Sequence, residues 1–101
     1  MIIRIFSAKV HPGKQAEYES LLRDEAIPGL SEQHGLVALH VGVPIPETPD
    51  EFVIITLWQD RESLQAFAGE SWLKSFVLPG EEHLVMQSEV HCYNSLPKPA
   101  T

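Results

Sequence analysis

The stretch Phe52-Val53-Ile54-Ile55-Thr56-Leu57-Trp58 decides the fold of this chain. It is rich in β-branched and aromatic residues and carries no charge, which predicts a strand. A strand with one face in water alternates apolar and polar residues, and this one barely does, so both of its faces need cover. In a chain of 101 residues, two helices cover only one face of a sheet. We therefore expect the other face to meet a second copy of the same sheet in a homodimer.

Composition and charge exclude several classes of protein. The formal net charge is −7, and the seven Lys and Arg residues are scattered, so the basic stripe that nucleic acid requires is missing. An acidic surface also disfavours anionic membranes. The apolar start of the chain is broken by Arg4 and Lys9 and is too short to span a membrane. Cys92 is the only cysteine, so no internal disulfide forms, and a reducing cytoplasm is the expected location.

Turn and cap residues divide the chain into alternating elements. A helix is expected from Pro12 or Gly13, with a kink or restart at Ile27 because Pro28 disfavours helical geometry there. Leu30 and Gln33 extend this helix up to a stop at Gly35. Strands are expected over 2–10, 36–43, 52–58 and 84–94.

The second helical region begins after the third strand. Asp60 is a good N-cap for a short helix that ends at Gly69. Ser71 can cap a further turn before Pro79-Gly80. The proline-containing tail 96–101 is expected to be loose, which leaves one domain over 1–95.

The resulting order, βαββαβ, predicts an α+β, ferredoxin-like fold with a four-stranded antiparallel sheet. In that topology the first and third strands are central and the other two are edges. The sequence agrees, because the first and third strands carry the most aliphatic bulk. The fourth strand is more polar at Gln87-Ser88-Glu89, as an edge strand should be.

Four segments resemble a known family. They are Trp58-Gln59-Asp60-Arg61-Glu62-Ser63, Phe67-Ala68-Gly69-Glu70, Pro79-Gly80-Glu81-Glu82 and Val90-His91-Cys92-Tyr93. Together with the layout of residues 1–95, they are similar to the antibiotic biosynthesis monooxygenase (ABM) domain, a member of the dimeric α+β barrels. The resemblance implies two four-stranded sheets packed face to face across a dimer axis. It also implies oxidation of a small electron-rich aromatic, of the anthrone or hydroquinone type, with no metal or flavin.

The chain departs from the haem-degrading members of that broad group. Those members use an Asn, a Trp and a His. Here Ser7 stands roughly at the Asn position and Phe67 at about the Trp position, and no histidine follows at the expected helical distance. Haem degradation is therefore not expected.

Three residues are candidates for catalysis. His40 lies in the apolar strand Ala38-Leu39-His40-Val41, and a histidine there has a tunable pKa that suits a general base. The alternative is a core or interface histidine held by one hydrogen bond. His91 and Tyr93 are two residues apart on the last strand and share one face. If that face lines a cavity, they form a base and a hydroxyl donor. If it faces solvent, they are ordinary edge residues.

Four further residues are candidates for substrate binding. Trp58 can stack on a flat substrate or anchor the third strand to the second helix. Phe67 is helix-spaced from Leu64 and fits the core. Trp72 is either a lid over a cavity or a plug of the core. His83 follows two glutamates, which favour its charged form, or it belongs to a solvated acidic turn.

The sequence contains no motif for a metal or an organic cofactor. It has no glycine-rich phosphate loop, no His-x-x-x-His or Cys-x-x-Cys spacing and no Gly-x-Ser-x-Gly elbow. Three functional hypotheses follow. The first is a cofactor-independent monooxygenase, the second a non-catalytic dimer that binds a small ligand or serves a stress response, and the third an isomerase of the muconolactone type. Consumption of O₂ separates the first from the third.

Overall fold

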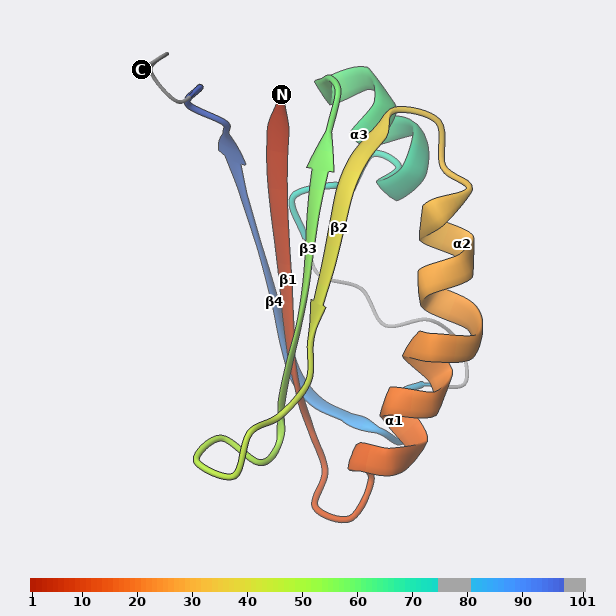
Figure 1. Ribbon diagram of the computed structural model, residues 1–101, viewed down its shortest axis with the longest axis vertical. Coiled ribbons are helices and arrows are strands. Elements are labelled where there is room, and N and C mark those ends of the chain that lie inside the picture. Colours follow the sequence, from red (N-terminus) through yellow and green to blue (C-terminus); the bar gives the residue numbers. More distant parts are fainter. Residues whose placement is uncertain (75–80, 98–101) are drawn as a thin grey trace.

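A computed structural model describes residues 1–74 and 81–97 of the chain. Four strands form one antiparallel sheet in the order β2-β3-β1-β4, and the helices lie along one side of it (Figure 1). This confirms the ferredoxin-like α+β fold with the first and third strands at the centre. The elements are β1 (Ile2–Val10), α1 (Gln15–Leu21), the π-helical turn η1 (Leu22–Ala26), α2 (Ile27–Ser31), β2 (Leu36–Gly42), β3 (Glu51–Trp58), α3 (Arg61–Ala68) and β4 (Val85–Asn94).

The two central strands each present one buried and one half-buried face. In β1 and β3 the even-numbered residues are buried beneath the helices, while most odd-numbered ones are half-buried on the opposite side. Paired positions keep this arrangement, since Phe6 lies beside Ile54 and Ile5 beside Ile55. The core consists of Ile2, Phe6, Ala8, Val10, Tyr18, Leu22, Leu30, Phe52, Ile54, Trp58, Leu64 and Leu84. We call the opposite side of the sheet, which carries Ile5 and Ile55, the open face.

The first helical region restarts where Pro28 requires it. A proline ring inside a helix removes one hydrogen bond and crowds the carbonyl four residues earlier. The chain accommodates Pro28 with the π-helical turn Leu22–Ala26, after which α2 begins at Ile27. The predicted restart is thus confirmed, but the wider π-helical turn was not foreseen.

The first helical region also ends earlier than predicted. Helix α2 stops at Ser31, and 32–35 form a turn in which the side chain of Gln33 donates to the carbonyl of Gly29 at 3.2 Å. Gly35 has φ 85°, and a side chain at this position would clash with Ser63. The extension of the helix by Gln33 was therefore wrong, while Gly35 does mark the entry to β2.

Helix α3 begins and ends as its cap residues predict. The N–H of Ser63 donates to the Asp60 carboxylate at 2.8 Å, and the helix ends before Gly69. A further turn follows, in which the N–H of Lys74 donates to the carbonyl of Ser71 at 2.8 Å. The predicted Pro79-Gly80 stop and most of the predicted loose tail lie outside the described residues.

Candidate functional site

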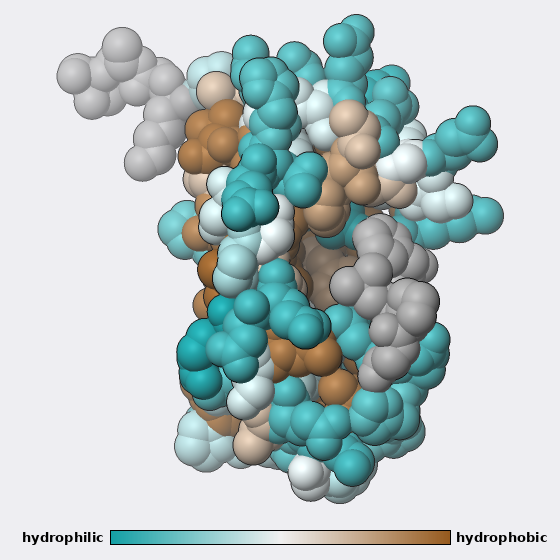
Figure 2. Space-filling model, turned by 90° about the vertical axis from the view of Figure 1, so that its right-hand side faces the viewer, coloured by the Kyte–Doolittle hydropathy of each residue, from teal (hydrophilic) through white to brown (hydrophobic). Residues whose placement is uncertain are grey.

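A cavity of about 320 Å³ lies between the sheet and the first helical region. Figure 2 shows this side hollowed, with hydrophobic atoms at depth. The volume falls within the range, roughly 300–1,000 Å³, that small-molecule sites occupy. The described residues that line it are Arg4, Phe6, Tyr18, Leu22, Glu25, Ala26, Gly29, Leu30, Gln33, Ile54, Phe67 and Glu81. We call it the helix-side cavity.

Arg4 places a positive charge in the wall of the helix-side cavity. It is the second even-numbered residue of β1 and is only 5 % exposed, between the apolar positions Ile2 and Phe6. Its Cζ lies 5.9 Å from the ring centroid of Phe6 and 6.0 Å from that of Phe67, within the range of cation–π attraction. Burial lowers the pKa of Arg4, and the neighbouring Cys92 raises it. The side chain remains a cation at neutral pH because a guanidinium is not deprotonated in proteins.

Phe67 forms the cavity wall on the side of α3, supported by a buried tryptophan. The rings of Phe67 and Trp58 stack with centroids 5.2 Å apart and an interplanar angle of 25°. Trp58 is fully buried, and its Nε1–H donates to the hydroxyl of Thr56 at 2.8 Å. Trp58 therefore anchors β3 to α3 and holds Phe67, and only Phe67 of this pair lines the cavity.

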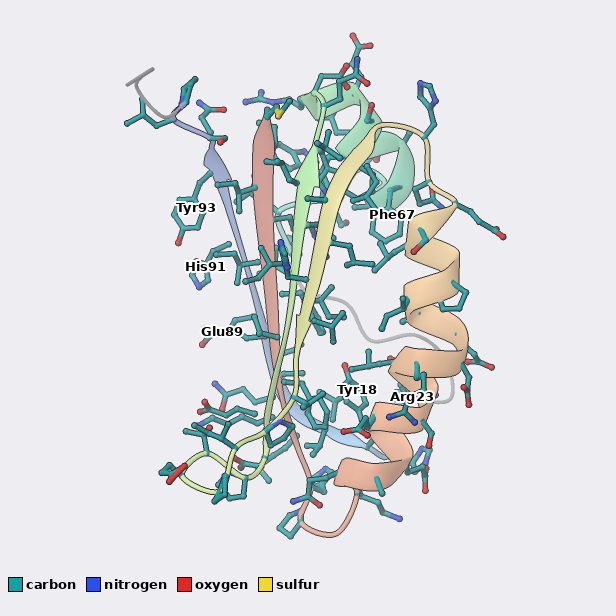
Figure 3. The ribbon with its side chains drawn as sticks, viewed as in Figure 1. Tyr18, Arg23, Phe67, Glu89, His91 and Tyr93 are labelled. Carbon is teal, nitrogen blue, oxygen red and sulfur yellow. The ribbon has the colours of Figure 1, made fainter. Side chains whose placement is uncertain are left out.

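Tyr18 brings a neutral hydroxyl to the opposite end of the cavity. It projects from α1 toward the sheet (Figure 3), and its ring meets Phe52 edge-on with centroids 4.9 Å apart. Burial, with a smaller contribution from Glu81, raises the pKa of Tyr18 to about 12. The phenol therefore stays protonated at neutral pH and can donate a hydrogen bond, but it cannot serve as a base there.

The helical wall of the cavity comes from η1 and α2. The π-helical turn contributes Leu22, Glu25 and Ala26, and such turns recur at functional sites. A side chain added at Gly29 would meet no atom within 4 Å, so this glycine leaves the wall open. Two carboxylates, Glu25 and Glu81, also line the cavity. They are the acidic groups best placed to accept a proton from a bound ligand.

The predicted catalytic residues lie on the open face. His40 pairs with Ile55, and His91 pairs with Ile5, so both share the side of the sheet that points away from the helices. Figure 3 shows His91 and Tyr93 projecting from that side together with Glu89. His91 Nε2 is 3.5 Å from a carboxylate oxygen of Glu89, and its ring lies 6.5 Å from that of Tyr93.

The sheet thus separates these three residues from the helix-side cavity within one chain. Their face contains a second hollow of about 610 Å³ near the loop between β2 and β3. That hollow is lined by Lys9 and Glu51, which form an ion pair at 3.7 Å, and by Glu89. A catalytic role for His40, His91 and Tyr93 stays a prediction.

The predicted binding residues are distributed over several places. Of the four, Phe67 lines the helix-side cavity. Trp72 packs against the core, with the guanidinium of Arg61 5.3 Å from its ring centroid. His83 is exposed, and its Nε2 lies 2.8 Å from a carboxylate oxygen of Glu17 on α1. This contact ties the segment before β4 to the first helix.

Sequence reasoning missed two polar residues of the cavity, Arg4 and Tyr18. Arg4 interrupts the apolar run of β1 and was read only as evidence against a membrane segment. Its even position groups it with Ile2 and Phe6 on one face of the strand, but Ile3 and Ile5 on the other face are also apolar, so the sequence does not show which face the helices cover. Tyr18 lies within the helix that the sequence predicts, but no local pattern shows that its side chain borders a cavity.

Residues 1–74 and 81–97 contain neither a candidate metal site nor a candidate membrane-spanning helix. Within these ranges no three His, Cys, Asp or Glu side chains gather in a way that could hold a metal ion. No helix among them has the length and apolar character needed to cross a membrane.

Comparison with known proteins identifies the family. The family model described as antibiotic biosynthesis monooxygenase matches residues 1–77, so the chain belongs to the antibiotic biosynthesis monooxygenase family. No curated protein matches the sequence closely enough to count as a relative.

Solved structures share the fold at low sequence identity. A Deinococcus radiodurans protein described as an antibiotic biosynthesis monooxygenase is 16% identical, with a TM-score of 0.77 over 100% of this chain and 98% of that one. SnoaB from Streptomyces nogalater, a cofactor-independent oxygenase, is 21% identical, with a TM-score of 0.72 over 96% and 94%. MhuD with bound manganese protoporphyrin IX is 15% identical, with a TM-score of 0.71 over 100% of both chains.

Proposed function

We propose that this protein is a monooxygenase that needs neither metal nor flavin and oxidises a small electron-rich aromatic in the helix-side cavity. The observation that carries the proposal is the cavity itself, where Phe6 and Phe67 line the space beside the buried cation of Arg4. Aromatic walls favour a flat ring as the ligand. Membership of the family and the naming of SnoaB as a cofactor-independent oxygenase support the reaction type.

The proposed reaction converts an anthrone or hydroquinone-type carbon to a quinone carbonyl. A base removes a proton from the substrate, and the resulting carbanion gives an electron to O₂. The two radicals combine into a peroxide on carbon, which takes up a proton. The remaining hydrogen of that carbon then leaves as a proton while the O–O bond breaks. One oxygen atom stays as the new carbonyl and the other leaves as water, so the substrate supplies all the electrons that O₂ accepts.

In this proposal, different residues of the cavity bind the ring, donate a hydrogen bond and accept the proton. Phe67 holds the ring plane, since its own position is fixed by the stack on Trp58. Tyr18 donates a hydrogen bond to an oxygen of the substrate, because its raised pKa keeps the phenol protonated. The proton leaves through Glu25 or Glu81, the carboxylates that line the cavity. In this proposal the base is a carboxylate, in place of the histidines predicted from the sequence.

An oxygen electrode tests the proposal. The protein, in metal-free buffer, is given a panel of anthrones and hydroquinones, and uptake above the protein-free rate is expected for at least one of them. Ala26→Leu fills the cavity and should abolish that uptake. Ala16→Leu is the matched control, because Ala16 is an exposed residue of α1 outside the cavity lining. Oxygen uptake no faster than the protein-free rate across the whole panel would refute the proposal.

A non-catalytic ligand-binding protein is the second candidate. The observation in its favour is that the described lining of the helix-side cavity contains no histidine, while His40 and His91 lie on the open face. Incubating the protein in air with a ligand that it binds, followed by extraction, distinguishes the two. Recovery of the ligand unchanged supports binding alone, whereas its oxidation supports the monooxygenase.

We further propose that two copies pack through their open faces. Proteins of this fold are commonly dimeric. The centre of the open face is apolar, with half-buried residues such as Ile5, Ile55 and Leu57, and β4 adds a polar margin that includes His91. An apolar centre with a polar rim is the usual anatomy of an interface. In such a dimer His40, His91 and Tyr93 lie at or near the contact between sheets.

Sedimentation at micromolar concentration tests the dimer. The unaltered protein should sediment as a dimer, and Ile55→Lys, which places a charge at the centre of the open face, should give a folded monomer. Ala16→Lys adds the same charge on the helical side and should leave the dimer intact. A well-folded monomer of the unaltered protein would refute the packing.

A further inference from the structure

A row of four paired residues crosses the middle of the open face. On β2, His40 pairs with Ile55 of β3. Ile55 pairs with Ile5 of β1, which pairs with His91 of β4, so a histidine lies at each end of the row. Neighbouring strands are about 4.8 Å apart, which places the two histidines of one chain roughly 14 Å from each other. Because the row is symmetric about its midpoint, a second copy rotated by 180° can bring histidines of two chains together.

The open face has a charged end and an apolar end. At the charged end Lys9 pairs with Glu51, and their side chains form an ion pair at 3.7 Å. At the apolar end Ile3 pairs with Leu57. Sheets that pack face to face keep their strand directions within about 30° of each other, so the two-fold axis of a dimer runs either along or across the strands.

An axis along the strands fits the chemistry of the open face better. It places β3 of one copy over β1 of the other, so that acid meets base at the charged end and apolar residues meet at the other end. An axis across the strands places the charged end of one copy over the apolar end of the other, and burying charge against apolar atoms costs free energy. The axis along the strands also places β2 over β4, so His40 of one copy faces His91 of the other. Two such pairs form, because the same patch of both copies makes the contact.

A carboxylate joins each pair of histidines. An oxygen of Glu89 lies 3.5 Å from Nε2 of His91, and both side chains project from the open face (Figure 3). Glu89 and Gly42 lie at opposite ends of the next row toward the charged end, and both line the hollow of about 610 Å³ on this face. Because glycine has no side chain, Gly42 of one copy leaves room for Glu89 of the other. His40 of one copy thus meets His91 and Glu89 of the second.

We infer that this group of three side chains binds a divalent transition-metal ion of the zinc type between two copies. Two imidazoles and a carboxylate form a ligand set that Zn²⁺ accepts, with water in the fourth position. The inference rests on the proposed packing of the open faces. Among the described residues of one chain no three such side chains gather, so the second copy completes each site. The sheet separates these sites from the helix-side cavity, so the ion stabilises the dimer and takes no part in the proposed oxidation.

Zinc binding and sedimentation test the site. Metal-free protein is dialysed against Zn²⁺, and one tightly bound ion per chain is expected. Zn²⁺ should also lower the dissociation constant of the dimer by at least about tenfold, because it binds the dimer better than the monomer. His40→Gln and His91→Gln should each lose both effects, and circular dichroism checks that these variants of exposed residues are folded. His83→Gln is the matched control, since His83 makes a similar pair with Glu17 beside α1 and should leave zinc binding unchanged.

Mixing the two variants shows whether each site joins two chains. The chain with His40→Gln keeps His91, and the chain with His91→Gln keeps His40, so neither variant alone forms a complete site. When equal amounts are refolded together from urea, half of the dimers are mixed and each mixed dimer has one complete site. About a quarter of the zinc bound by the unaltered protein should therefore return.

The outcomes separate the metal site from the dimer and from the proposed reaction. A metal-free dimer that binds no Zn²⁺ tightly, or one whose binding survives either histidine substitution, overturns the site and leaves the packing of the open faces intact. Failure of the mixed variants to recover zinc binding also overturns the site. A protein that stays monomeric with and without Zn²⁺ refutes the packing together with the site. Oxygen uptake in the helix-side cavity is independent of all these results.

Discussion

Replacing Tyr18 with phenylalanine should change how the stability of the protein depends on alkaline pH. Tyr18 is 2 % exposed, and burial and Glu81 raise its pKa to about 12 in the folded protein. In the unfolded chain a tyrosine titrates near pH 10. The folded state therefore disfavours the phenolate. The stability that the neutral phenol contributes is complete below about pH 10, and it is lost as the pH rises toward about 12.

The magnitude follows from these two pKa values. At 1.36 kcal/mol per pKa unit, the full loss above pH 12 is about 2.7 kcal/mol, and about half of it, ~1.4 kcal/mol, is already lost at pH 11. At pH 9 the loss is negligible. For a chain of this size, ~1.4 kcal/mol moves the urea midpoint by about 1 M. Tyr18→Phe has no phenol to ionise and should keep this part of its stability.

Urea unfolding at pH 9 and pH 11 measures the effect. The free energy of unfolding is compared for the unaltered protein and Tyr18→Phe at one protein concentration, since dimerisation makes stability concentration-dependent. If Tyr18→Phe loses as much stability between pH 9 and pH 11 as the unaltered protein does, the burial argument fails.

Further substitutions test local parts of the structure. Gly29→Ala should raise the free energy of unfolding by about 0.5–1 kcal/mol, because Gly29 lies in a helix and the added methyl meets nothing within 4 Å. Gly13→Ala should lower the free energy of unfolding, because Gly13 has φ 84°. Thermal melts in which both substitutions shift the melting temperature in the same direction would contradict this. Asp60→Ala should destabilise the protein near neutral pH. Hydrogen bonds from the backbone N–H of Ser63, and to a smaller extent from its side chain, lower the pKa of the Asp60 carboxyl. The difference in stability between Asp60→Ala and the unaltered protein should therefore vanish in acid, where this carboxylate becomes protonated. Asp60→Asn still caps α3 and should remain close to the unaltered protein, and a loss as large as that of Asp60→Ala would refute the capping role. Thr56→Val should cost about 1–3 kcal/mol and alter tryptophan fluorescence, since it leaves the buried indole N–H of Trp58 without its acceptor; unchanged urea midpoints would show that this hydrogen bond adds no stability.

Local rules in the sequence were enough to place most elements of the fold, although they missed the π-helical turn Leu22–Ala26 and the early end of α2. Asp60 and Gly69 bound α3 because a cap and a left-handed glycine act within a few residues. Pro28 fixed where the first helical region restarts, because its ring clashes with the helical carbonyl four residues earlier, a local effect that does not depend on the rest of the fold. The apolar stretch 52–58 indicated a central strand, because it lacks the alternation of apolar and polar residues that a strand with one solvent-exposed face shows.

The site could be predicted only in part. Phe67 was singled out and does line the cavity, because helical spacing places it on the face of α3 that meets the sheet. The side on which His40, His91 and Tyr93 lie could not be read from the sequence, because a spacing of two residues fixes only that residues share a face.

By itself, then, the sequence determined the order of the elements and the residues that share each face of a strand, because propensity, caps and periodicity are local properties. Only the tertiary structure decided which face of the sheet the helices cover, and therefore that Arg4 and Tyr18 line one cavity while His40 and His91 face away from it. That choice depends on packing between segments far apart in the chain, and no local pattern encodes it.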